Sequence, residues 1–155
     1  MRKRKPKKRV VQPDPRFGDT AVTMFVNNIM LQGKKSVAFK LFYDAMDIVA
    51  AKSEEDPHKI WHEAVANVTP MVEVRSRRIG GATFQIPTEI RAARRTSIAM
   101  KWLIKFSRAR SGKGFAEKLA AEVLAASKNE GAAVKRKEDT HKMAESNKAF
   151  AHFRV

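Results

Sequence analysis

The stretch VEVRSRRIGGATFQIP, residues 72–87, decides the fold, because it interrupts a chain that is otherwise patterned for helices. β-Branched residues stand on both sides of the Gly80-Gly81 pair, which predicts two antiparallel strands joined by a two-residue turn. That register puts Arg77 on the same face as Phe84, and Arg78 on the same face as Val74, so neither face is cleanly apolar. We expect the tip to project from the body as an arm, or a bulge to shift the register. The alternative is a hairpin that lies on the core.

Three helices are predicted before this stretch and three after it, because apolar residues recur there at helical spacing. Asp19 and Asp56 are suitable N-caps for the first and third helices, and Gly33 suits a left-handed end of the first. The predicted helices span about residues 20–32 and 36–52, then from Asp56-Pro57 to a stop at Thr69-Pro70, then about 90–110, 115–128 and 132–148.

Two of these helices carry more specific expectations. The fourth is expected to bury Ala99, Trp102, Leu103 and Phe106, with basic residues on the opposite face. The sixth is highly charged and is expected to be largely exposed or docked on a partner, since the residues it can bury are only Val134, His141, Met143 and Ala144.

The predicted fold class is therefore mainly α, a single domain of about six helices with a protruding β-hairpin arm and a basic extended N-terminal arm. Residues 1–18 form the extended arm in this interpretation, because Pro6, Pro13 and Pro15 block a regular helix there. Residues 19–155 form the helical domain, with the hairpin at about 72–87.

Positive charge is the strongest indication of function. Lys and Arg number 32 against 16 Asp and Glu, which gives a formal net charge of +16 on 155 residues. Seven of the first eleven residues are basic and none is acidic, which leaves +9 for the remainder, so the folded part must itself present a basic face. A nucleic acid is the commonest polyanion that offsets such charge.

Several other classes are disfavoured by what the sequence lacks. It contains no cysteine, which removes disulfides and thiolate metal sites and fits a reducing cytosol. It has no apolar run near the roughly 20 residues that span a bilayer, and no apolar segment follows the basic N-terminus as in a secretory signal. We expect no membrane association.

The sequence offers little for catalysis. His58 and His62 lie one helical turn apart, but Lys59 stands where a zincin would carry Glu, and no third ligand is obvious. The glycine-rich segments lack the spacing of a phosphate-binding loop. Acidic residues near helix ends are explained by helix electrostatics, although a metal-dependent nuclease stays a competing hypothesis. We expect no enzymatic activity, no metal and no cofactor.

Three arginine-rich clusters favour RNA. Arginine can bind phosphate oxygens bidentately or stack on a base, and structured RNA is read largely through shape, backbone and unpaired bases. Dispersed contacts suit a folded RNA junction, although an architectural DNA-binding protein stays the alternative. The clusters are Arg75, Arg77 and Arg78 on the hairpin, Arg91, Arg94 and Arg95 at the start of the fourth helix, and Arg108, Arg110 and Lys113 at its end.

Beyond these patterns, the chain closely resembles the bacterial small-subunit ribosomal protein seven family, nearly end to end. The motifs that carry the resemblance are Pro13-Asp14-Pro15, Gly33-Lys34-Lys35 with Leu41-Phe42 and Ala45 downstream, the run 72–81, Arg94-Arg95 leading to Ala99-Met100-Lys101-Trp102, and most specifically residues 134–154. Two departures are Phe153, where Tyr is frequent, and the end of the chain at Val155 without an extended tail.

The resemblance implies a non-enzymatic ribosomal protein in the cytoplasm. It implies direct binding to small-subunit rRNA in the head of the subunit and nucleation of head assembly. It also implies that the hairpin and the C-terminal helix lie near the exit-site tRNA and the mRNA path, beside a neighbouring small-subunit protein.

The predicted contact residues fall into two groups. The rRNA-contact candidates combine the cations of the arm with positions matched to the family: Arg2, Lys3, Arg4, Lys5, Lys7, Lys8, Arg9, Lys34, Lys35, Arg75, Arg77, Arg78, Arg91, Arg94, Arg95, Arg108, Arg110 and Lys113. The candidates for tRNA, mRNA or protein contact are Gly80, Gly81, Lys135, Arg136, Lys142 and Lys148.

Overall fold

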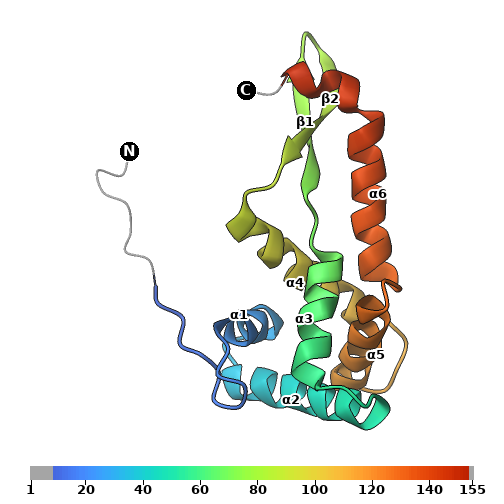
Figure 1. Cartoon of the computed structure of the whole chain (residues 1–155). Coiled ribbons are helices and arrows are strands. Elements are labelled where there is room, and N and C mark those ends of the chain that lie inside the picture. Colours follow the sequence, from blue (N-terminus) through green and yellow to red (C-terminus); the bar gives the residue numbers. More distant parts are fainter. Residues whose placement is uncertain (1–8, 154–155) are drawn as a thin grey trace.

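The computed structural model describes residues 9–153, and it confirms a mostly helical fold with a projecting two-stranded hairpin (Figure 1). The division of the chain at residue 18 stays a prediction. The elements are α1 (Thr20–Ile29), α2 (Lys35–Lys52), α3 (Pro57–Val68), β1 (Val72–Ile79), β2 (Ala82–Glu89), α4 (Ala92–Ala109), α5 (Phe115–Ser127), α6 (Ala132–Ser146) and the short 3₁₀ helix η1 (Lys148–Phe153).

Local capping chemistry places the first helices. The Asp19 carboxylate accepts the backbone N–H of Ala21 at 2.7 Å, and Asp56 accepts that of His58 at 3.1 Å, so both predicted N-caps are confirmed. The first helix ends three residues earlier than predicted, at Ile29. Gln32 and Gly33 then both adopt positive φ, at 53° and 74°, which turns the chain into α2.

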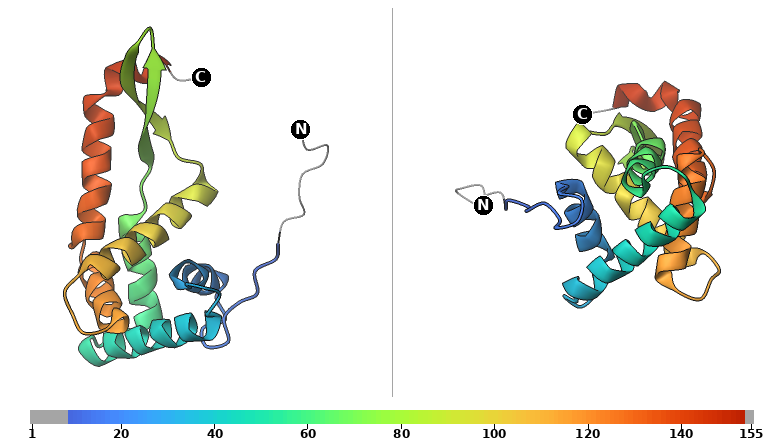
Figure 2. Two further views of the ribbon diagram at one scale, coloured as in Figure 1. Left: turned by 180° about the vertical axis from the view of Figure 1, so that it is seen from behind. Right: turned by 60° about the horizontal axis from the view of Figure 1, so that its bottom comes forward.

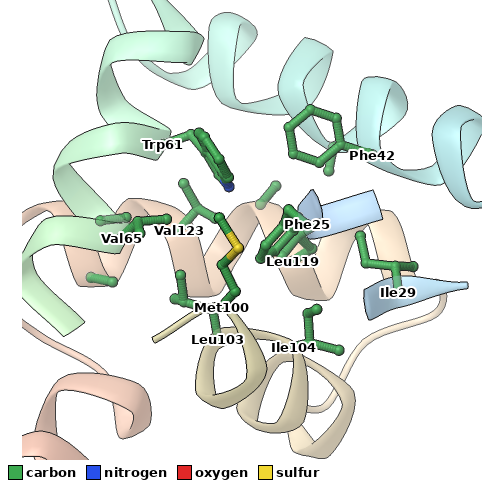
Figure 3. Close-up of a cluster of buried hydrophobic side chains, with 14 of the residues drawn as sticks. Phe25, Ile29, Phe42, Trp61, Val65, Met100, Leu103, Ile104, Leu119 and Val123 are labelled. Atoms are coloured by element: carbon green, nitrogen blue, oxygen red, sulfur yellow. The ribbon is translucent and has the colours of Figure 1, made fainter. Parts of the chain in front are cut away.

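One core joins α1, α2, α3, α4, α5 and the start of α6 (Figure 3). Phe25, Phe42 and Trp61 are fully buried and meet edge to face, with ring centroids 5.4 to 5.8 Å apart. Such aromatic pairs favour one packing arrangement over others because their ring quadrupoles are directional. Leu119 and Val123 of α5 complete the centre of the core.

The buried face of α4 differs from the prediction. Ala99 and Leu103 are buried as expected, but Trp102 and Phe106 are only partly buried, while Met100, Ile104 and Ser107 are buried. The reason is that α4 contacts α1 on one side and α3, α5 and α6 on others, so its buried stripe is rotated away from Trp102. Ser107 fits in this stripe because its hydroxyl donates to the Leu103 carbonyl at 2.7 Å.

The hairpin projects from the body, as predicted, and is not bulged. Its register is continuous from Val72 opposite Glu89 to Ile79 opposite Ala82, with Gly80 and Gly81 in the turn. In the lower half of the hairpin Ile86 is buried, as is Ile90 just after the second strand.

The C-terminal segment supports the hairpin, which the sequence did not predict. α6 runs alongside the strands, and η1 crosses near the tip (Figures 1 and 2). Phe84 packs on Phe150 and Phe153, with centroids 5.2 and 5.6 Å away, and the Arg77 guanidinium donates to the Phe153 carbonyl at 2.9 Å. One face of the hairpin is therefore covered by the end of the chain.

α6 is largely exposed, as expected, but its buried stripe differs in part. Val134 and Ala144 are buried as predicted, whereas Met143 is 41% exposed. His141 is partly buried and accepts the backbone N–H of Met71 at 3.1 Å. Burial, with the nearby Lys137 charge, lowers the pKa of His141, which favours the neutral imidazole that can accept this bond.

A buried carboxylate joins α4, α5 and α6. Glu122 of α5 is fully buried, and its two oxygens accept the Arg110 Nε–H at 2.5 Å and the Ala133 N–H at 2.9 Å. Gly131, at φ 93°, passes so close that an added Cβ would lie 3.1 Å from the carboxylate. The start of α6 is thus held against the end of α4.

A second buried carboxylate fastens the segment before α1. Asp14 is 3% exposed and accepts the N–H groups of Arg16, Phe17 and Asp19 at 2.9 to 3.1 Å and the Tyr43 hydroxyl at 3.1 Å. Burial raises the pKa of Asp14, but these hydrogen bonds outweigh it and hold the pKa below its ordinary value. The stability of the folded state therefore depends on ionised Asp14 and decreases when acid protonates it.

We predict that Glu122→Ala lowers the free energy of unfolding by about 3 kcal/mol, because it removes one partner of a buried ion pair and leaves the Ala133 N–H unsatisfied. Urea unfolding followed by circular dichroism measures this loss. The matched control is Glu130→Ala, at an exposed position in the connection between α5 and α6. This variant should change the free energy of unfolding by less than about 0.5 kcal/mol. Equal effects of the two variants would contradict the structural role of Glu122.

We also predict a specific acid dependence. Because the folded-state pKa of Asp14 lies below the ordinary value of 3.8, its contribution to stability is complete above that value and is lost as the pH falls through the folded-state pKa. Asp14→Asn should therefore flatten the decline of urea-unfolding stability below about pH 4. The exposed Asp139→Asn should follow the parent chain, and an unchanged slope in Asp14→Asn would refute the assignment.

Candidate nucleic-acid interface

The exposed side of α4 carries an open basic surface. Lys101, Lys105 and Arg108 line a groove of about 620 Å³ together with Asn28 of α1. Within residues 9–153, no carboxylate lies within salt-bridge distance of these three cations. Arg108 was predicted as a contact residue. Lys101 and Lys105 were not, although their helical spacing from Arg108 was visible in the sequence.

A pocket of about 330 Å³ adjoins this groove between α1, α2 and the start of α5. Its lining combines apolar surface from Leu31 and Phe115 with the cations Arg108, Lys113 and Lys118. Arg108 is positioned there by donating to the Ile29 carbonyl at 3.0 Å and by lying over the Phe115 ring. The predicted contact residues Arg108 and Lys113 therefore line the same pocket. Lys118, which was not predicted as a contact residue, lines it as well.

The base of the hairpin and the start of α4 form a third concave surface, of about 720 Å³. Three predicted contact residues, Arg75, Arg91 and Arg94, line it. Glu73 lies between them, 2.6 Å from Arg75 and 3.4 Å from Arg94. Burial raises the pKa of Glu73, but the two guanidinium groups outweigh it and lower the pKa below its ordinary value. The carboxylate therefore stays charged and orients both arginines.

Two predicted contact residues also hold the fold together. Arg95 has a side chain only 22% exposed, and it donates to the Ile90 carbonyl and to Glu89, each at 2.8 Å. Arg110 holds the buried Glu122. Both were placed among the surface cations on sequence alone, because sequence spacing does not reveal a partner on another element.

The hairpin cations do not form a single surface. Arg77 stands opposite Phe84 and contacts the C-terminal segment, whereas Arg78 points to the other face of the pleated strand. Gly80 and Gly81, with positive φ at the exposed tip, leave backbone open to a partner. The predicted cluster is thus divided between the two faces.

The remaining predicted residues are more scattered. Lys34 and Lys35 are exposed at the turn before α2, and Arg9 is exposed in an extended segment. On α6 and just beyond it, Lys135, Arg136, Lys142 and Lys148 are exposed, with Arg136 over the Trp102 ring. Six predicted residues of the arm lie outside the described residues: Arg2, Lys3, Arg4, Lys5, Lys7 and Lys8.

The two histidines of α3 have a neighbour that their spacing did not reveal. Asp19 lies within hydrogen-bond distance of both His58 and His62, so a candidate third metal ligand is present after all. Burial raises the pKa of Asp19, but the Ala21 N–H and the two histidines outweigh it and hold the pKa below its usual value. Across residues 9–153, this is the one cluster of three or more potential metal-ligating side chains.

The part of the chain that the structure describes contains no helix long and apolar enough to cross a bilayer.

We predict that Arg95→Ala lowers the melting temperature whereas Arg91→Ala does not. Arg95→Ala removes hydrogen bonds worth about 1–2 kcal/mol, which corresponds to roughly 2–8 °C for a domain of this size. Arg91 is exposed and has no ion-pair partner among residues 9–153. Thermal unfolding followed by circular dichroism distinguishes them, and equal melting temperatures for the two variants would argue against an internal role for Arg95.

Comparison with known proteins gives a consistent result along the whole chain. The family described as Ribosomal protein S7p/S5e matches residues 1–148. Small ribosomal subunit protein uS7 of Flavobacterium psychrophilum is 64% identical over 157 aligned residues, which cover 99% of each chain. The proteins of the same name from Christiangramia forsetii and Cytophaga hutchinsonii are 64% and 56% identical, again over 99% of each chain.

Proposed function

The chain belongs to the Ribosomal protein S7p/S5e family, and on that premise we propose that it binds small-subunit rRNA directly, nucleates assembly of the head, and lies near the exit-site tRNA and the mRNA path. Membership makes it a structural, non-enzymatic protein of the small subunit, located in the ribosome of the cytoplasm. Neighbouring ribosomal proteins are further proposed partners.

The observation that carries rRNA binding is the open cationic face of α4. Lys101, Lys105 and Arg108 repeat along one exposed side of a helix whose other side is buried in the core. Because no carboxylate of residues 9–153 neutralises them, they are available to phosphate oxygens, and binding them releases condensed counterions. A rigid helix also presents these charges at fixed spacing, which favours a structured backbone over a flexible one.

The separation of the basic surfaces supports a role in assembly. The α4 groove lies on the helical body, while the surface around Arg75 and Arg94 lies at the base of the hairpin. One rigid protein that contacts RNA at both places holds two RNA segments in a defined relation. This lowers the entropic cost of bringing the two RNA segments together. A protein that lowers this cost favours folding of the RNA domain and so nucleates its assembly.

The pocket beside Phe115 adds a means of recognising RNA specifically. The apolar surface of Leu31 and Phe115, with three nearby cations, offers apolar contact to an unpaired base and ionic contact to its phosphate. A continuous duplex has no unstacked base to offer. A folded RNA with unpaired nucleotides therefore fits this surface better than duplex DNA does.

The hairpin and α6 form the projecting end of the molecule (Figure 2). A concave surface of about 660 Å³ lies between them and includes Met71, His141, Ala144 and Lys148. Its lining combines apolar residues and cations with the carboxylates Glu89 and Glu145, which suits a protein neighbour. The exposed tip at Gly80 and Gly81 supports placement of this end toward tRNA and mRNA.

We predict that Lys101→Ala with Lys105→Ala weakens binding to head-domain rRNA and reduces the salt dependence of log K by about 0.7–0.9 for each phosphate that the variant no longer neutralises. Equilibrium filter binding across a salt series measures both quantities. The matched control is Lys40→Ala with Lys52→Ala, which removes the same charge from exposed positions of α2.

Two results would count against the proposal. Equal weakening by both double variants would mean that only net charge matters, and equal affinity of the parent chain for rRNA and duplex DNA at matched salt would remove the preference for folded RNA. Chemical probing of the same rRNA complexes tests assembly, since two distant RNA segments should become protected together.

A further inference from the structure

We propose that Asp19, His58 and His62 form a binding site for a zinc ion where α1 meets α3. His58 and His62 lie one turn apart on α3, and Asp19 is the N-cap of α1. Asp19 Oδ2 lies 3.1 Å from His58 Nε2 and 2.8 Å from His62 Nε2, and the three potential ligand atoms all lie within 4.8 Å of one another. This inference is independent of RNA binding.

The donor set selects the kind of metal. Two imidazole nitrogens and one carboxylate oxygen are ligands that Zn²⁺ favours, and three protein ligands with water in the fourth position make a common open zinc site. Mg²⁺ and Ca²⁺ prefer oxygen ligands throughout, so they fit this cluster poorly.

The ligand atoms are already close to the arrangement that zinc needs. Metal–ligand bonds of about 2.0–2.2 Å in a tetrahedron place ligand atoms roughly 3.3 Å apart. The separations of 2.8 and 3.1 Å between Asp19 and the two histidines therefore have to widen by a few tenths of an ångström. The two histidine nitrogens lie within 4.8 Å of each other and have to approach by at most about 1.5 Å. The His62 side chain is 48% exposed and has room to make that adjustment.

The groups around the ligands orient them. The other oxygen of Asp19, Oδ1, accepts the Ala21 N–H at 2.7 Å, which leaves Oδ2 facing the histidines. Phe17 stacks on the His58 ring with centroids 4.9 Å apart and planes 6° from parallel. Trp61 lies against His62 at 4.9 Å. Fixed ligand orientation and an apolar wall both strengthen metal binding.

The site is reachable from solvent on one side. The side chains of Asp19 and His58 are 19% and 24% exposed, and His62 is half exposed. An ion can therefore enter past His62 and retain a water ligand. Because Asp19 and His62 are 43 residues apart in the chain, zinc would join two distant elements and stabilise the folded state over the unfolded one.

The test is isothermal titration of zinc chloride into the full-length, untagged chain after chelator treatment and dialysis. We expect saturable binding of one equivalent, weakened at least tenfold by Asp19→Asn and by His62→Gln. Asparagine is as good an N-cap as aspartate, so Asp19→Asn removes the charged ligand while keeping the cap of α1. The matched control is His152→Gln in η1, which should bind zinc as the parent chain does.

Thermal unfolding gives a second readout. Zinc should raise the melting temperature of the parent chain and of His152→Gln, and not that of Asp19→Asn. The proposal is overturned if the parent chain shows no saturable binding, if it binds no tighter than Asp19→Asn, or if His152→Gln loses as much affinity. Should circular dichroism show that His62→Gln is unfolded, Asp19→Asn alone decides. Because rRNA is absent from both measurements, failure here leaves the proposed RNA binding separately testable.

Discussion

The arrangement of this molecule depends on one buried charge. Glu122 is fully buried in α5, where an unpaired carboxylate would be prohibitively costly. Arg110 and the Ala133 N–H together satisfy it, and Gly131 allows the chain to pass beside it. Those partners come from the end of α4 and the start of α6. Satisfying this one group therefore sets where α6 begins, and α6 in turn carries the segment that covers the hairpin.

The high net charge is distributed between two roles. Some cations pair with carboxylates where helices and strands meet, as Arg110 does with Glu122 and Arg95 does with Glu89. Others, such as Lys101 and Lys105, stand on an exposed helix face with no acidic neighbour among residues 9–153. The paired cations rigidify the elements that carry the unpaired ones. A preorganised basic surface loses less entropy on binding, so the internal pairs contribute to the proposed RNA contacts without touching RNA.

Much of the fold was predictable because it is encoded locally. Apolar periodicity located the helices, Asp19 and Asp56 marked two helix starts, and the Gly80-Gly81 pair marked the hairpin turn. The candidate surface was predictable only in part. The cations could be recognised as basic, but which of them faced solvent could not, since Arg95 turns inward to the Ile90 carbonyl and Arg91 does not.

Sequence alone determined the type of each element, the surplus of positive charge and the family resemblance. These properties depend on short runs of neighbouring residues or on the composition of the whole chain. Tertiary structure alone decided which face of α4 is buried, that Phe153 packs on Phe84 near the hairpin tip, and that Asp19 meets His62. Each of these results joins residues far apart in the chain. Their contact depends on how whole helices and strands pack against one another, which a local sequence pattern does not predict.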